Sequence, residues 1–278
     1  MLPCHLGLVS LTSAVSFVDV APVSAAIQKQ LARDFNPLWS VDATIDPFPT
    51  LADVPSDYWK IMIVDTFKRG GQHKVRHQQP YALVAAGASW SLAASHEALE
   101  MLADPSGNRT IAAPSPVDGQ GRVDFLVEVC DPCQGDEFAY AVNGILVSDF
   151  YTPNYFDPVT SPSVRYSFCG AIRQPRQVLP GGYLSWREPS SGDWYQQNRF
   201  GPELAVKNFG PIEPDGTLRS MMDAHAGEPH ELSSLMTNRP SMQRIARIRA
   251  SVDAASAAHA QNFNDVLRHR GVKADAMR

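Results

Sequence analysis

The positions of the prolines constrain this chain more than any other feature, because most of its 22 prolines lie between residues 105 and 240. Proline locks φ and has no backbone N–H, so it interrupts helices and is excluded from central strands. This part of the chain should therefore contain turns and short strands. Long helices are expected only before residue 105 and after residue 240.

The first ninety residues combine strand and helix patterns. A helix is expected at about residues 20–35, and the polar, glycine-containing residues 70–79 predict a loop or hairpin. Apolar or alternating segments predict strands at residues 6–18, 39–48, 58–67 and 80–86, the last of these being the edge strand. This order predicts a mixed sheet packed over whatever helix follows it.

That following helix is well marked. Either Ser89 or Ser91 can cap its N-terminus, and strong helix formers continue to Asp104-Pro105, where it should end. The helix therefore carries the segment from residue 92 to residue 103 against the sheet. The fold class predicted from these elements is α+β.

Beyond residue 105 the segments with an apolar or alternating pattern are shorter. A strand is expected at residues 123–129, a hairpin at 138–156 turning at Asn143-Gly144, and short strands with turns at 163–186. Residues 215–240 are polar and aperiodic and predict a linker or mobile loop. Residues 242–270 have a seven-residue apolar repeat, typical of a coiled-coil seam or docking helix, or of a helix packed on its own domain.

Three parts follow from these patterns: a domain at residues 1–214, a linker at 215–240 and a C-terminal helix at 241–278. Residues 241–270 are the segment expected to mediate self-association or protein docking.

Charge and composition exclude several classes of protein. The net charge of -5 and the absence of a long Lys/Arg run argue against a nucleic-acid partner. Membrane association is not expected, because no segment approaches ~18 uninterrupted apolar residues. The apolar N-terminus lacks a basic residue before Lys29, unlike a secretory signal, and four cysteines are too few for a disulfide framework. A cytoplasmic location is therefore predicted.

The segment His96-Glu97-Ala98-Leu99-Glu100 carries the predicted chemistry. Residues four apart share one face of a helix, so His96 and Glu100 can bind one metal ion, with Glu97 beside a metal-bound water. Zinc lowers the pKa of such a water to about 7, and a neighbouring carboxylate can act as the general base. The competing interpretation is a solvated helix face that carries two glutamates and one histidine.

Glu100 departs from the usual pattern, in which a second histidine occupies its position. A carboxylate is a competent zinc ligand, but its negative charge weakens the metal as a Lewis acid. A third ligand is expected from the segment 128–131, where Asp131 is favoured over Glu128. Asp104 is a further candidate, better explained as ending the helix.

Other polar residues have weaker predicted roles. Cys130 and Cys133 form a single CxxC, which we interpret as two thiols flanking Asp131 rather than a redox site. His73 and His77 are interpreted as surface histidines of a loop rather than ligands of a second metal. An oxyanion-stabilising tyrosine is expected, with Tyr151 favoured among four candidates. These candidates are Tyr140, Tyr151, Tyr155 and Tyr183.

Two segments carry a resemblance to a known group of proteins. Residues 95–105 read SHEALEMLADP and residues 128–133 read EVCDPC. This pair resembles zincin-like metallopeptidases with a His-Glu-x-x-Glu motif, most closely uncharacterised bacterial ones and more distantly the plant exordium family. The resemblance covers roughly residues 55–160. It implies a zincin-like mixed sheet over an active-site helix, followed here by a second half rich in strands and loops and a C-terminal helix.

The function expected from motif and resemblance together is zinc-dependent hydrolysis of a peptide bond in a peptide or protein substrate. Zn²⁺ would be held by His96, Glu100 and Asp131 or Glu128, with Glu97 as general base and Tyr151 stabilising the oxyanion. The alternatives are a catalytically degenerate zincin that serves as a binding module, and a structural protein assembled through the C-terminal helix.

Overall fold

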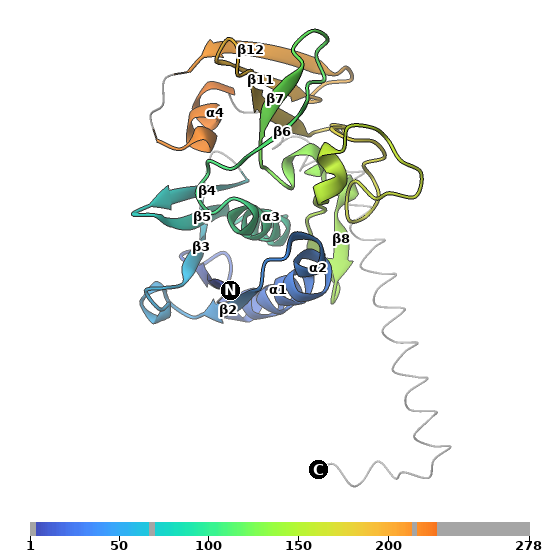
Figure 1. Ribbon diagram of the computed structural model, residues 1–278. Helices are drawn as coiled ribbons and strands as arrows, with labels where there is room; N and C mark the ends of the chain where they lie inside the picture. Colours follow the sequence, from blue (N-terminus) through green and yellow to red (C-terminus); the bar gives the residue numbers. More distant parts are fainter. Residues whose placement is uncertain (1–3, 67–69, 213–215, 227–278) are drawn as a thin grey trace, which may run out of the picture.

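The computed structural model describes residues 4–66, 70–212 and 216–226. The fold is α+β, as predicted, and consists of two five-stranded sheets, one two-stranded sheet and several helices. In Figure 1 the first sheet and helices α1–α3 form the lower part, and the second sheet with α4 lies above them.

The first sheet has the strand order β2-β1-β3-β5-β4, in which β4 alone is antiparallel to its neighbour. Its strands are β1 (Cys4–Ser10), β2 (Ala43–Phe48), β3 (Trp59–Val64), β4 (Gly71–Arg76) and β5 (Gln79–Ala85). The expected hairpin at 70–79 is thus present. The predicted edge strand is wrong, because β5 is interior and β4 forms the edge.

Helices α1 (Phe17–Gln30) and α3 (Trp90–Ala103) cover one face of this sheet (Figure 1). The predicted first strand is too long: β1 ends at Ser10, and the Asp19 carboxylate accepts hydrogen bonds from the Ser16 N–H and hydroxyl at the start of α1. A π-helical turn (Leu31–Phe35) and the short α2 (Asn36–Trp39) continue from α1.

A buried polar network fixes α3 against α1. The Ser95 hydroxyl donates to Gln30 Oε1 at 2.8 Å and accepts from the Ser148 N–H at 3.0 Å. Gln30 Nε2 in turn donates to the Ser148 carbonyl at 2.9 Å. Because each buried partner is satisfied by the next, the helix face that carries residue 96 is held in one orientation.

The proline-rich part consists of short strands and turns, as predicted. The second sheet is antiparallel in the order β12-β11-β10-β7-β6. Its strands are β6 (Thr110–Pro114), β7 (Arg122–Leu126), β10 (Tyr183–Arg187), β11 (Asp193–Asn198) and β12 (Ala205–Pro211). The hairpin predicted at 138–156 forms over a shorter range, between β8 (Tyr140–Val142) and β9 (Ile145–Val147), and a 3-10 helix occupies residues 153–156 instead. Positive φ angles of 50° at Asn143 and 77° at Gly144 give the hairpin its tight turn.

Short 3-10 helices lie in the connections of both halves of the chain. They span Leu51–Asp53, Asp131–Cys133, Asp136–Phe138 and Pro153–Phe156. The second of them follows β7 and carries the segment around Asp131 back towards α3.

Part of the predicted linker is a helix, α4 (Leu218–Ala226). Met221 and Met222 of α4 pack in a buried cluster with Leu126 and Trp194, and Gln72 of β4 donates to Asp223 at 2.7 Å. The linker prediction is therefore wrong for residues 218–226, because two buried methionines give too weak an apolar pattern to be recognised. The remainder of the predicted linker and the C-terminal helix at 241–278 lie outside the described residues.

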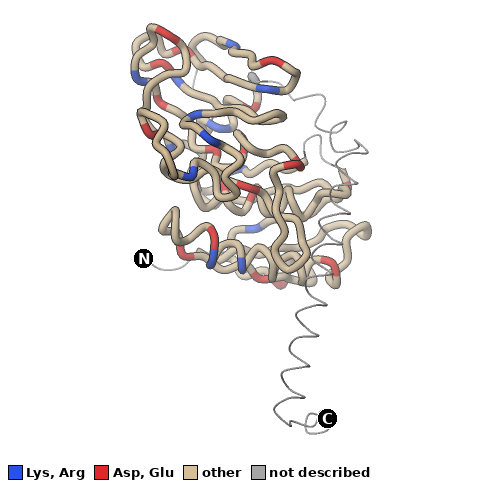
Figure 2. Tube along the Cα trace, turned by 90° about the vertical axis from the view of Figure 1, so that its right-hand side faces the viewer, with Lys and Arg blue, Asp and Glu red and all other residues tan. Residues whose placement is uncertain are grey.

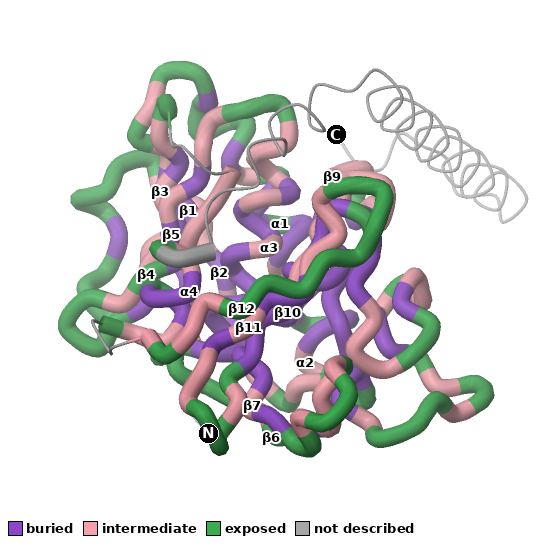
Figure 3. Tube along the Cα trace, turned by 90° about the horizontal axis from the view of Figure 1, so that it is seen from above, coloured by how far each residue is buried: buried purple, intermediate pink, exposed green. Residues whose placement is uncertain are grey.

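The main core extends across both sheets and encloses α3. Apolar residues of α3, including Ala98 and Leu99, share one buried cluster with Ile61 and Ile63 of β3 and with Phe125 of β7. Buried segments accordingly occupy the centre of Figure 3, and exposed loops surround them. Lys/Arg and Asp/Glu are interspersed along the described chain in Figure 2. Among the described residues, every helix is too short or too polar to cross a membrane.

Candidate metal centre

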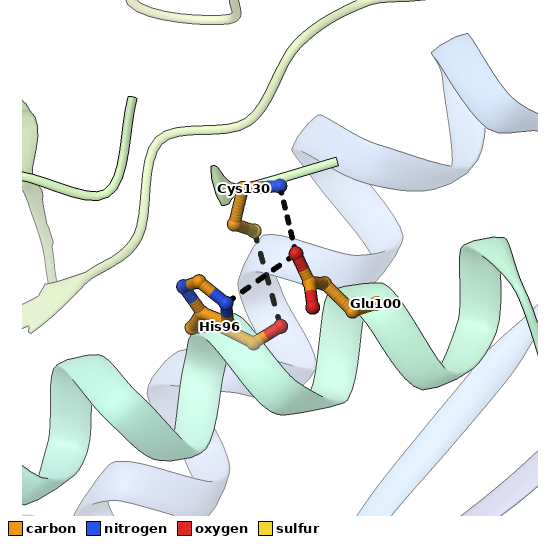
Figure 4. A group of neighbouring side chains, drawn as sticks. All are labelled: His96, Glu100 and Cys130. Carbon is orange, nitrogen blue, oxygen red and sulfur yellow. Dashed lines mark hydrogen bonds and ion pairs between the residues drawn. The ribbon is translucent and has the colours of Figure 1, made fainter. Parts of the chain in front are cut away.

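Helix α3 places His96 and Glu100 one turn apart on the same face, opposite the segment that follows β7 (Figure 4). The Cys130 N–H donates to Glu100 Oε1 at 3.2 Å, and Cys130 Sγ lies 3.8 Å from the His96 carbonyl oxygen. This backbone contact orients the Glu100 carboxylate towards His96.

The His96 ring lies between the carboxylates of Glu100 and Asp131. His96 Nε2 lies 3.3 Å from Glu100 Oε1 and 3.2 Å from Asp131 Oδ1. Ligand atoms that bind zinc at about 2.0–2.2 Å in a tetrahedron are separated by roughly 3.3–3.6 Å, so these distances are close to those of two tetrahedral edges. One nitrogen and two oxygens are also an accepted zinc donor set. Two of the three edges of this donor set therefore fit zinc. Among the described residues, the group with His96 and Glu100 whose ligand atoms all lie within 4.8 Å of one another is completed by Cys130, with Asp131 outside it.

Each residue of this group has a shifted pKa. Burial would lower the pKa of His96, but the charges of Glu100 and Asp131 outweigh burial and raise it well above its ordinary value. Burial and the charge of Glu100 raise the pKa of Asp131. Carboxylates this close repel one another, and the repulsion is relieved by protons or by a metal.

Glu128, the less favoured third ligand, has a different neighbour. Its carboxylate is buried, and Glu128 Oε1 lies 3.9 Å from Arg219 Nη1. Burial, followed by the charge of Asp131, raises the pKa of Glu128 well above its ordinary value. Within the described part of the chain, Glu128 therefore forms its ion pair with Arg219, whereas Asp131 contacts His96 as well.

Glu97 extends towards the edge strand β4. His73 Nδ1 of β4 lies 3.3 Å from Glu97 Oε2 and 3.7 Å from Glu100 Oε2. A Cβ at Gly71 would lie 2.6 Å from Glu97 Oε1, so only glycine leaves room for this carboxylate in its present position. The backbone at Gly71 and the side chain of His73, both on β4, together fix the position of the Glu97 carboxylate.

His73 corrects an interpretation made from the sequence. The sequence places it in a surface loop, but it is 3% exposed and points inward from β4. The inward alternation at residues 71, 73 and 75 is the available signal, and the polarity of the segment obscures it. His77 is exposed in the β4–β5 turn, as expected.

Arg219 of α4 is a site residue that sequence reasoning missed entirely. Its side chain is 6% exposed, forms a close ion pair from Nη2 to Glu100 Oε2, and places the same nitrogen 3.9 Å from Asp131 Oδ2. Burial would raise the pKa of Glu100, but the charges of Arg219 and then His96 outweigh burial and hold the pKa well below its usual range. Nothing in the local sequence pattern indicates this role.

The four candidate tyrosines differ in the burial of their side chains and in the hydrogen bonds of their hydroxyl groups. Tyr140 donates to Asp34, and Tyr155 donates to the Gln177 carbonyl, so both hydroxyls are engaged elsewhere. The favoured Tyr151 is fully buried, and its hydroxyl has no hydrogen-bond partner among the described residues. Tyr183 is half-buried and starts β10. Burial raises the pKa of both Tyr151 and Tyr183 well above the ordinary value, and the charges of Asp131 and Glu128 add to this rise.

The remaining candidates have structural explanations. Asp104 accepts hydrogen bonds from the N–H groups of Asn108 and Arg109 and from Ser106, and so shapes the turn after α3. Cys130 and Cys133 are free and buried, and burial raises the pKa of both thiols well above the ordinary value. High thiol pKa values disfavour the reactive thiolate, which argues against redox chemistry.

Comparison of the chain with protein-family models, with curated proteins and with solved structures gives no match in any of the three. The site must therefore be interpreted from its own geometry.

Proposed function

We propose that this chain is a zinc-dependent enzyme that hydrolyses peptide bonds and that it has a zincin-like ancestry. One observation carries the proposal: His96 Nε2 lies 3.3 Å from Glu100 Oε1 and 3.2 Å from Asp131 Oδ1, which is close to two edges of a zinc tetrahedron, and His96, Glu100 and Cys130 offer ligand atoms within 4.8 Å of one another. The free state of all four cysteines agrees with a cytoplasmic location.

His96, Glu100 and Asp131 would hold the metal. When bound, zinc would lower the pKa of a water molecule and polarise the substrate carbonyl. Glu97 is the general base: its carboxylate accepts the proton of the attacking water and returns it to the leaving amine. His73 and Gly71 keep that carboxylate in place from β4.

The position of β4 supports a peptide as substrate. It is the edge strand of the first sheet, and its outer side pairs with no other described strand. An extended peptide can add to such an edge through backbone hydrogen bonds. Glu97 lies against the same strand, so a peptide bound there would be close to the proposed base.

The oxyanion role falls to a tyrosine in the second half of the chain. Tyr151 stays a candidate because its hydroxyl is unpartnered within the described part of the chain. Tyr183 is the better placed of the two for substrate contact, because it is half-buried rather than fully enclosed.

The test combines metal analysis with one substitution. Purified wild-type protein should contain about one zinc per chain, and Glu97→Gln should keep that zinc while kcat falls by about 10²–10⁴-fold. The matched control is Glu137→Gln, which changes a carboxylate elsewhere in the chain and should leave both values unchanged. Peptide cleavage that persists in Glu97→Gln would refute the mechanism.

A catalytically degenerate zincin that serves as a binding module is the second candidate. The specific observation in its favour is Arg219, a cation that already balances the buried carboxylates. This candidate predicts protein without stoichiometric zinc, or with zinc and no hydrolysis of any peptide mixture. The same metal analysis and peptide assay therefore distinguish the two functions.

A further inference from the structure

The two carboxylates that face His96 divide their oxygens between two partners. Glu100 Oε1 and Asp131 Oδ1 face His96, at 3.3 Å and 3.2 Å. Their other oxygens, Glu100 Oε2 and Asp131 Oδ2, both face the single nitrogen Nη2 of Arg219. Arg219 thus faces oxygens other than those that face His96, and Glu100 Oε2 also lies 3.7 Å from His73 Nδ1.

This placement leaves the metal position open. An arginine that substituted for the metal would contact the same oxygens as His96, whereas Arg219 contacts the opposite ones. It engages one oxygen of each carboxylate, while Glu100 Oε1 on the His96 side also accepts the Cys130 N–H at 3.2 Å. A carboxylate with one oxygen engaged elsewhere binds a metal through a single atom, as a histidine does.

The charge balance points the same way. Zinc with two histidines and one carboxylate carries a formal net charge of plus one, whereas exchanging one histidine for Glu100 reduces it to zero. The positive charge of Arg219, beside Glu100 and Asp131, offsets the added negative charge, and Arg219 also faces Glu128 at 3.9 Å. A site with less negative charge keeps the metal a stronger Lewis acid.

We propose that Arg219 is part of the metal centre, a positioning residue that binds the outer oxygens of Glu100 and Asp131 and compensates for the glutamate that replaces the second histidine. The inference rests on the proposed function, because it requires zinc at His96, Glu100 and Asp131. It assigns α4, a helix outside the resemblance to zincin-like proteins, to the site.

The first experiment compares melting temperatures with and without zinc. Arg219→Met removes the charge but keeps an apolar stem, and it leaves the outer oxygens unpaired. Because zinc partly offsets this loss, the zinc-free protein should lose more thermal stability than the zinc-loaded one. We also expect kcat to fall about 10- to 100-fold with little change in KM.

Two controls define what a structural role alone would do. Arg122→Met removes an exposed arginine that bonds the Ala112 carbonyl and should leave the zinc-induced increase in melting temperature unchanged. Arg219→Lys keeps the charge without the planar fork and should lie between wild type and Arg219→Met.

The second experiment restores the usual second histidine. Glu100→His alone leaves Arg219 without its closest partner, so the double variant Glu100→His/Arg219→Met should be more stable than Glu100→His. It should also recover at least about tenfold in kcat relative to Arg219→Met, since the net charge of the centre is restored. The comparison of stability between the double variant and Glu100→His remains valid if Arg219→Met alone does not fold.

The outcomes separate the inference from the function it rests on. Wild-type protein that binds no zinc would overturn both. Two results would overturn only the role of Arg219, provided that the wild type binds zinc and hydrolyses peptides. One is that Arg219→Met loses equal stability with and without zinc, and the other is that the effects of Glu100→His and Arg219→Met are additive. A rise in kcat in Arg219→Met would overturn this role as well, by showing that Arg219 obstructs the site.

Discussion

Two histidines lie beside the same carboxylates, and their surroundings differ. His96 is on α3, its side chain is 14% exposed, and its Nε2 faces carboxylates from two separate segments at 3.2–3.3 Å. His73 is on β4, is almost fully buried, and its Nδ1 faces Glu97 at 3.3 Å and Glu100 at 3.7 Å. Two groups of described residues are close enough to hold a metal ion: His96, Glu100 and Cys130 on one side, and His73, Glu97 and Glu100 on the other.

The difference separates the two sides of one acidic cluster. The His96 side collects a nitrogen, two carboxylate oxygens and a backbone donor to Glu100, which is an arrangement for holding a cation. The His73 side contains the proposed base, confined by Gly71 and paired with a neighbouring ring. We infer that the first side holds the metal and the second orients Glu97.

The largest expected effect comes from removing each histidine in turn. His96→Ala should lose stoichiometric zinc, because it removes the only nitrogen in the proposed donor set. His73→Ala should keep about one zinc per chain. Metal analysis after dialysis against a weak chelator measures both, and retention of zinc in His96→Ala but not in His73→Ala would reverse the assignment of the two sides.

A smaller change at β4 should affect Glu97 without removing any ligand. In Gly71→Ala the new methyl group occupies the place of the Glu97 carboxylate, which must move by rotation of its flexible side chain. Misplacement of a catalytic group by about 1 Å can cost roughly 100-fold in rate, so kcat should fall by up to that factor while zinc content is unchanged.

The control for this substitution is Gly201→Ala, at an exposed glycine where an added Cβ would meet no other atom within 4 Å. Wild-type kcat in Gly71→Ala, with folding verified by circular dichroism, would mean that the position of the Glu97 carboxylate does not matter for activity. The melting temperatures of both variants should stay near that of the wild type.

The smallest expected effect concerns the orienting ring itself. His73→Gln keeps a polar group near Glu97 but loses the imidazole, and kcat should fall about tenfold with zinc content and KM preserved. His77→Gln, at the exposed turn of the same hairpin, serves as the matched control. Steady-state kinetics that give equal kcat for the two variants would remove His73 from the account.

The sequence is most informative where chemistry follows from regular spacing. His96 and Glu100 are four apart on a well-marked helical segment, so their shared face follows from the sequence alone. Asp131 can be proposed as their partner because it follows an apolar strand. The Asn143-Gly144 turn is similarly local, since only a few residues tolerate its positive φ angles.

The rest of the site depends on contacts between distant segments. Arg219 reaches Glu100 only because Met221 and Met222 anchor α4 on the second sheet, and that packing leaves almost no pattern in a polar segment. The prediction for His73 is wrong because polar residues on both sides hide the alternation of a half-buried edge strand. Tertiary packing determines both positions.

The central claim is most directly tested by a crystal structure of the zinc-loaded protein with data collected at the zinc absorption edge. The account predicts one anomalous peak, about 2.0–2.2 Å from His96 Nε2, Glu100 Oε1 and Asp131 Oδ1, with Arg219 still on the outer oxygens. A peak bound by His73 and Glu97, or zinc-soaked crystals without any peak, would contradict it.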